Sequence, residues 1–136
     1  MLSDQTLMAA ASLQRNMYIA LNEVAELTDE LAQAVSRQDQ VSVRLFLSMR
    51  QEEIDRLMGH RAALRRQCDQ LSAQDRRQLR RLLAGATDCI PPSPAGEALA
   101  LQVRNTRSLL ERVCRADQAV SLRFGGSNSF YAKKKK

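Results

Sequence analysis

Tryptophan is absent from this 136-residue chain, and three phenylalanines and two tyrosines are its only aromatic residues. Five glycines and three prolines are too few for the many tight turns of an all-β fold. Apolar residues make up 44% of the chain and are mainly Leu, Ala, Val and Met, which suit helices. The composition therefore predicts an all-α protein with an aliphatic core, of a length typical for one domain.

Side chains for catalysis and metal binding are scarce. The chain has one histidine, His60, and three cysteines, Cys68, Cys89 and Cys114, which form no Cys-x-x-Cys motif and no cluster with metal-ligand spacing. No glycine-rich phosphate loop is present, and no nucleophile and base can be paired. We therefore predict a protein that is not an enzyme and uses no cofactor or metal, with reduced thiols.

Long apolar runs are absent as well. No segment approaches the roughly 20 apolar residues of a membrane-spanning helix. The first twelve residues, MLSDQTLMAAAS, lack the basic start of a secretory signal peptide and contain an early aspartate. We therefore expect a cytoplasmic protein without a membrane span.

Charge is unevenly distributed along the chain, whose net charge is +6. Residues 1–40 contain six acidic and two basic side chains, whereas residues 41–85 contain five acidic and ten basic ones. This asymmetry favours antiparallel packing of two helices and is first a signal of self-association. The densest basic stretch is RRQLRRLL, residues 76–83, a pattern also found in phosphate binders. Without a recognition helix or an aromatic platform, we expect no nucleic-acid partner.

Heptad spacing predicts two long helices joined by a short break. Apolar residues recur at steps of four and three from Leu13 to Ala34, which predicts a first helix over about residues 4–37. Asp39 is the predicted N-cap of a second helix, whose apolar seam is interrupted by Arg50 and Arg61. Together the two helices are predicted to form a long antiparallel hairpin of the coiled-coil type.

A capping box and a proline-rich linker follow. Ser72 has the spacing of a capping box and precedes a short helix that Gly85 is predicted to end, and the alternative is that this segment continues the second helix with a kink. Residues 86–96 contain all three prolines and form the predicted linker. Ser93 and Pro94 have the pattern of an N-cap followed by a first-turn proline, which predicts the start of the last helix.

The last helix has its own heptad seam, which is predicted to pack on the hairpin as part of a bundle. The seam positions are Leu99, Val103, Thr106, Leu110, Val113, Asp117, Val120 and Phe124. Gly125 and Gly126 are predicted to end the helix. Residues 1–126 are therefore predicted to form a single helical domain, and residues 127–136 a flexible basic tail.

Leucines outside this seam widen the apolar surface of the last helix. Leu101, Leu109 and Leu122, together with Val113 of the seam, are predicted to form an exposed groove for a partner, and the alternative is that they close the bundle or a homodimer. On this assignment Leu110→Asp unfolds the protein, whereas Leu109→Asp leaves folding intact. In the tail, Phe130 and Tyr131 are predicted to contact a partner, with the four terminal lysines attracting the tail to an acidic surface.

The order of these segments is similar to that of a known protein family. A long first helix is followed by AVSRQDQVSVRLFLSMRQEEIDRL, residues 34–57, and NTRSLLERV, residues 105–113, stands near the end. The pattern resembles that of the FlgN-like flagellar export chaperones, in which an Asn and an aliphatic pair open the apolar stretch of the last helix and a tail with a Tyr follows. The matching positions are Asn105, Leu109, Leu110 and Tyr131. The linker at residues 86–96 and the four lysines depart from that pattern.

The resemblance implies a cytosolic chaperone that binds hook–filament junction proteins, prevents their premature assembly and delivers them to the flagellar export gate. Such a chaperone shields an amphipathic helix of its cargo in an apolar groove. The residues expected to contact the partner are Leu101, Asn105, Leu109, Leu122, Phe130 and Tyr131. The alternatives are a homodimeric helical structural or adaptor protein and, more weakly supported, a basic nucleic-acid-associated protein.

Overall fold

The computed structural model describes residues 1–123, which form four helices and no strand. The helices are α1 (Asp4–Ser36), α2 (Gln40–Asp69), α3 (Ala73–Leu83) and α4 (Pro94–Arg123). The predicted all-α fold, with a helical hairpin and a last helix packed on it, is confirmed. The predicted seam position Phe124, the helix end at Gly125 and Gly126, and the tail lie outside the described residues.

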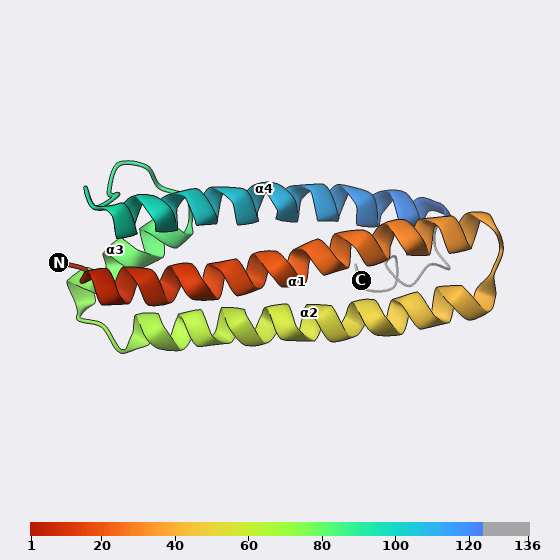
Figure 1. The fold of residues 1–136 in the computed structure, drawn as a ribbon, viewed down its shortest axis with the longest axis horizontal. Helices are drawn as coiled ribbons and strands as arrows, with labels where there is room; N and C mark the ends of the chain where they lie inside the picture. Colours follow the sequence, from red (N-terminus) through yellow and green to blue (C-terminus); the bar gives the residue numbers. More distant parts are fainter. Residues whose placement is uncertain (124–136) are drawn as a thin grey trace.

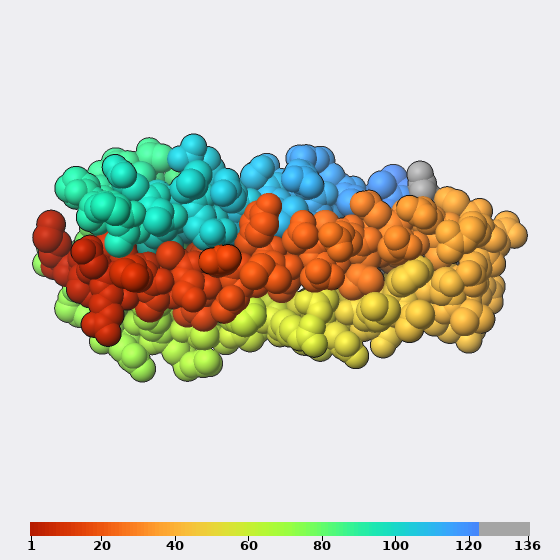
Figure 2. Space-filling view, in the orientation of Figure 1, coloured from red at the N-terminus to blue at the C-terminus, as the bar shows by residue number. Residues whose placement is uncertain are grey.

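The three long helices lie roughly parallel or antiparallel, with α1 in the middle. α1 packs against α2 on one side and against α4 on the other, and α3 lies at the end that holds the N-terminus (Figure 1). On the face shown in Figure 2, α1 runs between α4 and α2 along the length of the molecule. The first helix is therefore the centre of the fold, and the other helices are arranged around it.

Side-chain caps begin the helices where the sequence predicts them. The carboxylate of Asp39 accepts a hydrogen bond from the backbone N–H of Ser42 at 3.1 Å, and Ser72 Oγ accepts one from the N–H of Asp75 at 3.3 Å. Ser93 caps α4 in the same way. Each bond satisfies an N–H that the first turn of a helix leaves unpaired. The hydroxyl of Ser42 also donates to Asp39, which lowers the pKa of that carboxyl.

Two helices end in Schellman turns, each with one residue in the left-handed region. At the end of α1 this residue is Gln38, with φ of 58°, and the N–H of Asp39 donates to the carbonyl of Ala34 at 3.0 Å. At the end of α3 it is Gly85, with φ of 95°. Glycine adopts this conformation without steric cost, which is why the sequence marks the second turn and not the first.

Gly59→Ala and Gly85→Ala are expected to change the free energy of unfolding in opposite directions. A Cβ atom at Gly59, within α2, would meet no heavy atom within 4 Å, so alanine should stabilise the helix by about 0.5–1 kcal/mol. A Cβ atom at Gly85 would lie 3.2 Å from Nε of Arg107 on a left-handed backbone, so alanine should destabilise by about 1–2 kcal/mol. Urea denaturation of the two variants measures both changes, and changes of the same sign would contradict the expectation.

Much of the core lies in two apolar clusters along α1. The first, at the α3 end, draws on all four helices and contains Leu2, Leu7, Ala10, Leu64, Cys68, Leu79, Leu82, Leu99 and Val103. The second lies further along α1 and contains Leu21 and Val24 from α1 and Leu109 and Val113 from α4, with Leu57 of α2 packed against it. Burial of these side chains holds α2 and α4 on opposite sides of α1.

A buried arginine joins the three long helices beyond the second cluster. Arg50 of α2 is 4% exposed, its Nε donates to Thr28 Oγ1 of α1 at 3.0 Å, and its guanidinium contacts the carboxylate of Asp117 on α4. Thr28 in turn donates to the carbonyl of Val24 at 2.7 Å. Arg50, which interrupts the predicted seam of the second helix, therefore forms a polar contact with each of the other long helices.

The predicted seam of the last helix is wrong at one turn. Leu109, assigned to the exposed strip, is 2% exposed, whereas Leu110, assigned to the buried seam, is 45% exposed. Adjacent residues of an α-helix point about 100° apart, so the two leucines cannot both face α1. Leu109 packs with Leu21 and Val24 of α1, and Leu110 lines the space between α4 and α2.

Candidate functional site

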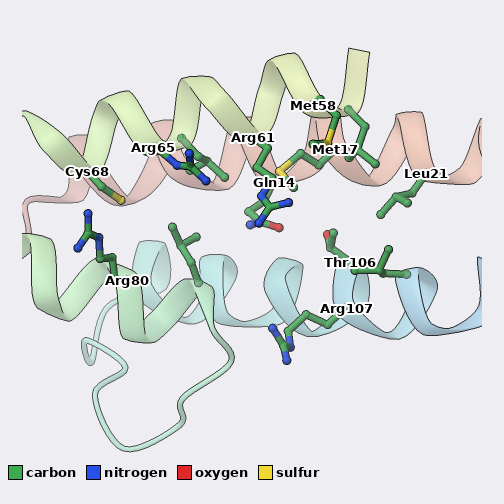
Figure 3. A pocket seen from close by; sticks show the side chains of 14 residues that line it. Gln14, Met17, Leu21, Met58, Arg61, Arg65, Cys68, Arg80, Thr106 and Arg107 are labelled. Carbon is green, nitrogen blue, oxygen red and sulfur yellow. The ribbon is translucent and has the colours of Figure 1, made fainter. Parts of the chain in front are cut away.

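A groove lies between α2 and α4. Both helices pack on α1, but within the described residues no Cα atom of α2 lies within 8 Å of one in α4. The space between them is a groove of about 630 Å³, with α1 as its floor and α3 at one end (Figure 3). The lining residues are Gln14, Met17, Leu21, Leu57, Met58, Arg61, Leu64, Arg65, Cys68, Arg80, Leu83, Thr106, Arg107 and Leu110.

The lining of the groove is mainly apolar. Leu21 and Leu64 are buried, Met17 is half-buried, and Met58 and Leu110 are 50% and 45% exposed. Two large apolar side chains from facing helices thus remain accessible to water across the same groove. Burying them against a partner would be favourable, at about 25 cal/mol per Å² of apolar surface.

Four arginines border the groove. Arg61 and Arg65 lie one turn apart on α2, Arg80 lies on α3 and Arg107 on α4, and all four are exposed. Figure 3 shows Arg61 pointing from α2 into the space between the helices. Arg80 lies 3.5 Å from Asp69, but both side chains are more than half exposed, and such surface pairs contribute little. The border of the groove is therefore positively charged.

Two polar side chains that line the groove are buried, Thr106 of α4 and Gln14 of α1. Thr106 Oγ1 donates to the carbonyl of Gln102 on its own helix at 2.9 Å, so its hydroxyl is satisfied. Gln14 is 5% exposed, and its Oε1 has no hydrogen-bond partner among the described residues. An unsatisfied buried amide costs about 1–3 kcal/mol. Gln14 is therefore the one lining side chain of the described groove with a buried, unpaired acceptor.

The sequence-predicted contact residues do not meet in this groove. Leu101, Asn105 and Leu122 are exposed on α4 but line no part of the groove, and Leu109 is buried in the core. The assignment of Leu109 to an exposed partner surface is therefore wrong, because that side chain already packs between α4 and α1. The exposed strip of Leu101 and Leu122 stays a prediction.

The predicted tail contacts, Phe130 and Tyr131, lie outside the described residues. The sequence did not indicate the groove positions that the fold brings together, among them Gln14, Leu110 and Arg61. One signal was present for Arg61, because a charged residue stands in a heptad slot of the second helix. No local pattern distinguishes Gln14 from other polar residues of the first helix.

The basic stretch at residues 76–83 is largely engaged within the chain. Arg76 donates from Nε to the carbonyl of Cys68 at 3.3 Å and from Nη2 to that of Leu71 at 3.2 Å, which caps the end of α2. Arg81 binds both carboxylate oxygens of Asp88 at 2.6 Å, and this bond lowers the pKa of the Asp88 carboxyl. Arg76 therefore stabilises the turn between α2 and α3, whereas Arg81 and Asp88 form a surface pair after α3.

The three cysteines are free thiols that differ in their exposure to solvent. Cys68 is buried in the groove floor, Cys89 is half-buried and Cys114 is exposed. Burial raises the pKa of the Cys68 thiol, which keeps it protonated near neutral pH. Within residues 1–123, no three His, Cys, Asp or Glu side chains are grouped so that they could hold a metal ion.

No family model, curated protein or solved structure matches this chain. In the described part of the chain, no helix combines the length and apolar character needed to cross a bilayer. The groove and its side chains are therefore the features of the molecule from which a function can be inferred.

Proposed function

We propose that this protein is a helix-binding export chaperone that holds an amphipathic helix of its cargo in the groove between α2 and α4. The observation that carries the proposal is the open fourth side of the bundle. Three long helices normally gain a fourth, or close on one another, to bury their apolar faces. Here α3 covers only one end of that side, and Met58 and Leu110 remain exposed beyond it.

The resemblance to the FlgN-like chaperones supplies the cargo and the place of action. On this proposal the protein acts in the cytoplasm, binds hook–filament junction proteins and delivers them to the flagellar export gate. It binds its cargo and catalyses no reaction. Helix-in-groove binding is a general mode of recognition, in which apolar side chains spaced three and four residues apart enter the groove.

A homodimeric adaptor is the alternative, in which a second copy covers the exposed apolar surface. The groove disfavours it, because the acidic helix of a second copy is α1, which is already packed between α2 and α4 and cannot enter a groove bordered by arginines. A nucleic-acid-associated protein is less supported, since Arg76 and Arg81 of the basic stretch already have partners within the chain.

Leu110→Asp is expected to weaken binding of a purified hook–filament junction protein by at least about tenfold, because it places a carboxylate on the apolar groove wall. Leu101→Asp is the matched variant, since Leu101 is similarly exposed on the same helix but lies outside the groove. It should change the dissociation constant by less than about twofold, within the range of surface substitutions. Isothermal titration calorimetry measures both.

Two outcomes would contradict the proposal. A greater loss with Leu101→Asp than with Leu110→Asp would assign cargo binding to the outward strip of α4 that the sequence predicts. No binding of any hook–filament junction protein to the wild-type chain, together with concentration-dependent dimerisation in analytical ultracentrifugation, would favour the adaptor. Secretion of the cargo by cells that carry each variant tests the export role separately from binding.

A further inference from the structure

Positive charge borders the groove on three helices. Arg61 and Arg65 of α2, Arg80 of α3 and Arg107 of α4 surround the floor, and none of the lining residues is acidic. Arg61 and Arg65 stand four residues apart on one helix, a spacing at which like charges repel each other. Within the described residues neither of these two forms an ion pair. Anionic groups bound between them would relieve that repulsion.

The length of the groove limits what it can hold. Its lining residues on α2 extend from Leu57 to Cys68, which corresponds to about 16 Å along a helix axis. α3 already packs on Leu64 and Cys68 at one end of this span, so the open part accepts about two turns of a partner helix. α3 contacts both α2 and α4 at the adjoining end, so the partner helix would continue the same side of the bundle beyond Leu83.

The floor supplies a second, independent indication of a ligand. Gln14 is 95% buried, since its exposed fraction is 5%, and its Oε1 lacks a hydrogen-bond partner among the described residues. Figure 3 places Gln14 in the middle of the groove, with Arg61 directed toward it from α2. A purely structural packing position would favour an apolar side chain there. A bound molecule with a hydrogen-bond donor near Gln14 would satisfy that oxygen.

We propose that the groove selects an acidic amphipathic helix, with two carboxylates one turn apart that pair with Arg61 and Arg65. This inference rests on the proposed function and specifies the chemistry of the cargo. The two arginines are separated by about 6 Å along α2, and carboxylates at i and i+4 of a helix lying alongside have the same separation. Such charge-assisted pairs combine affinity with a fixed register. Apolar side chains of the same helix contact Met17, Leu57 and Leu110.

A second copy of this chain is a poor occupant. Its acidic helix is α1, where Glu23, Glu26, Asp29 and Glu30 are exposed. That helix is already flanked by α2 and α4 of its own chain, so it cannot enter a groove between two helices of another copy. The acidic helix therefore belongs to a different protein.

Three synthetic peptides test the charge selection. They share one amphipathic helical sequence of about 14 residues and differ at two flanking positions, i and i+4, which are both Glu, both Gln or both Lys. Fluorescence anisotropy with the full-length protein is expected to give a dissociation constant at least about tenfold lower for the Glu peptide than for the Gln peptide, and the weakest binding for the Lys peptide. The Glu preference should shrink between 50 and 500 mM NaCl, because salt screens exposed charges.

Matched variants locate the effect on the protein. Arg61→Gln/Arg65→Gln should reduce the preference for Glu over Gln to less than about threefold, because the paired charges are gone. Arg112→Gln/Arg115→Gln makes the same change of charge on α4 outside the groove and should retain the preference. Leu110→Asp should weaken all three peptides, since it changes the groove wall itself.

Each alternative outcome has a definite meaning. If the three peptides bind equally well, or if no peptide binds, the proposed charge selection is overturned. The proposed function would then still be decided by the cargo-binding and secretion experiments. A Glu preference that is lost equally with the Arg112/Arg115 variant would show a general effect of net charge and also overturn it. If the Leu110→Asp variant still binds the Glu peptide selectively and with unchanged affinity, the peptide binds outside the groove, and the inference is overturned. Selective binding in the groove without capture of hook–filament junction proteins would support the inference and contradict the proposed cargo.

Discussion

Leu109→Asp is expected to be unfolded without denaturant, whereas Leu110→Asp is expected to remain folded and helical. Leu109 is 2% exposed between α1 and α4, and an ionised carboxylate there would have no partner and no water. That costs several kcal/mol, a large part of the roughly 5–15 kcal/mol that stabilises a small domain. Leu110 is 45% exposed, so the carboxylate of its variant stays hydrated.

Circular dichroism and urea denaturation check the pair, and alanine variants give a graded version of the same comparison. Leu109→Ala should lose about 2–5 kcal/mol, as buried leucines do, and Leu110→Ala less than about 1 kcal/mol. A greater loss of stability for Leu110→Ala than for Leu109→Ala would mean that Leu110 is the buried residue, as the heptad spacing of α4 predicts. The comparison also bears on function, because Leu110→Asp is expected to lose cargo while folded.

Asp117→Ala is expected to lower the free energy of unfolding by about 3 kcal/mol, the lower end of the range for breaking a buried ion pair. The substitution removes the carboxylate that contacts the guanidinium of Arg50, which is 4% exposed. The side chain of Asp117 itself is 27% exposed, so water reaches part of the site and limits the loss. Urea denaturation is the suitable measurement, because guanidinium chloride would screen the charges.

The double variant Arg50→Met/Asp117→Leu is the control for that result. It replaces the pair with apolar side chains of similar volume, and such replacements of buried ion pairs are often neutral or stabilising. We therefore expect it to recover most of the stability that Asp117→Ala loses. A loss below about 1 kcal/mol for Asp117→Ala, or a double variant less stable than the single one, would show that the contact is not the main cause.

Helix ends were predictable from the sequence because their causes are local. Asp39, Ser72 and Ser93 were identified as N-caps and Gly85 as a helix end, and the structure confirms all four. A cap needs only a side-chain oxygen near an N–H two or three residues further along, so neighbouring residues suffice to predict it. The end of α1 was less well marked because Gln38, rather than glycine, takes the left-handed conformation there.

The side of α4 that packs against α1 was less predictable from the sequence than the helix ends. Heptad spacing assigned Leu110 to the core and Leu109 to the surface, and the structure places them the other way round. Adjacent residues on a helix differ by about 100° in direction, so a modest rotation of the contact face exchanges one for the other. Contact residues that depend on which side of α4 faces its neighbours, such as those of the groove, could therefore not be identified from the sequence.

The amino-acid sequence by itself determined the three long helices, most of the capped helix starts and an antiparallel hairpin with a further helix, since periodicity and capping act over a few residues. Only the tertiary structure decided that α2 and α4 stand apart on α1, that Arg50 is buried beside Asp117, and that four arginines border one apolar groove. These features depend on side chains far apart in sequence meeting across helices. Their positions follow from how the helices rotate and drift as they pack, which no local pattern specifies.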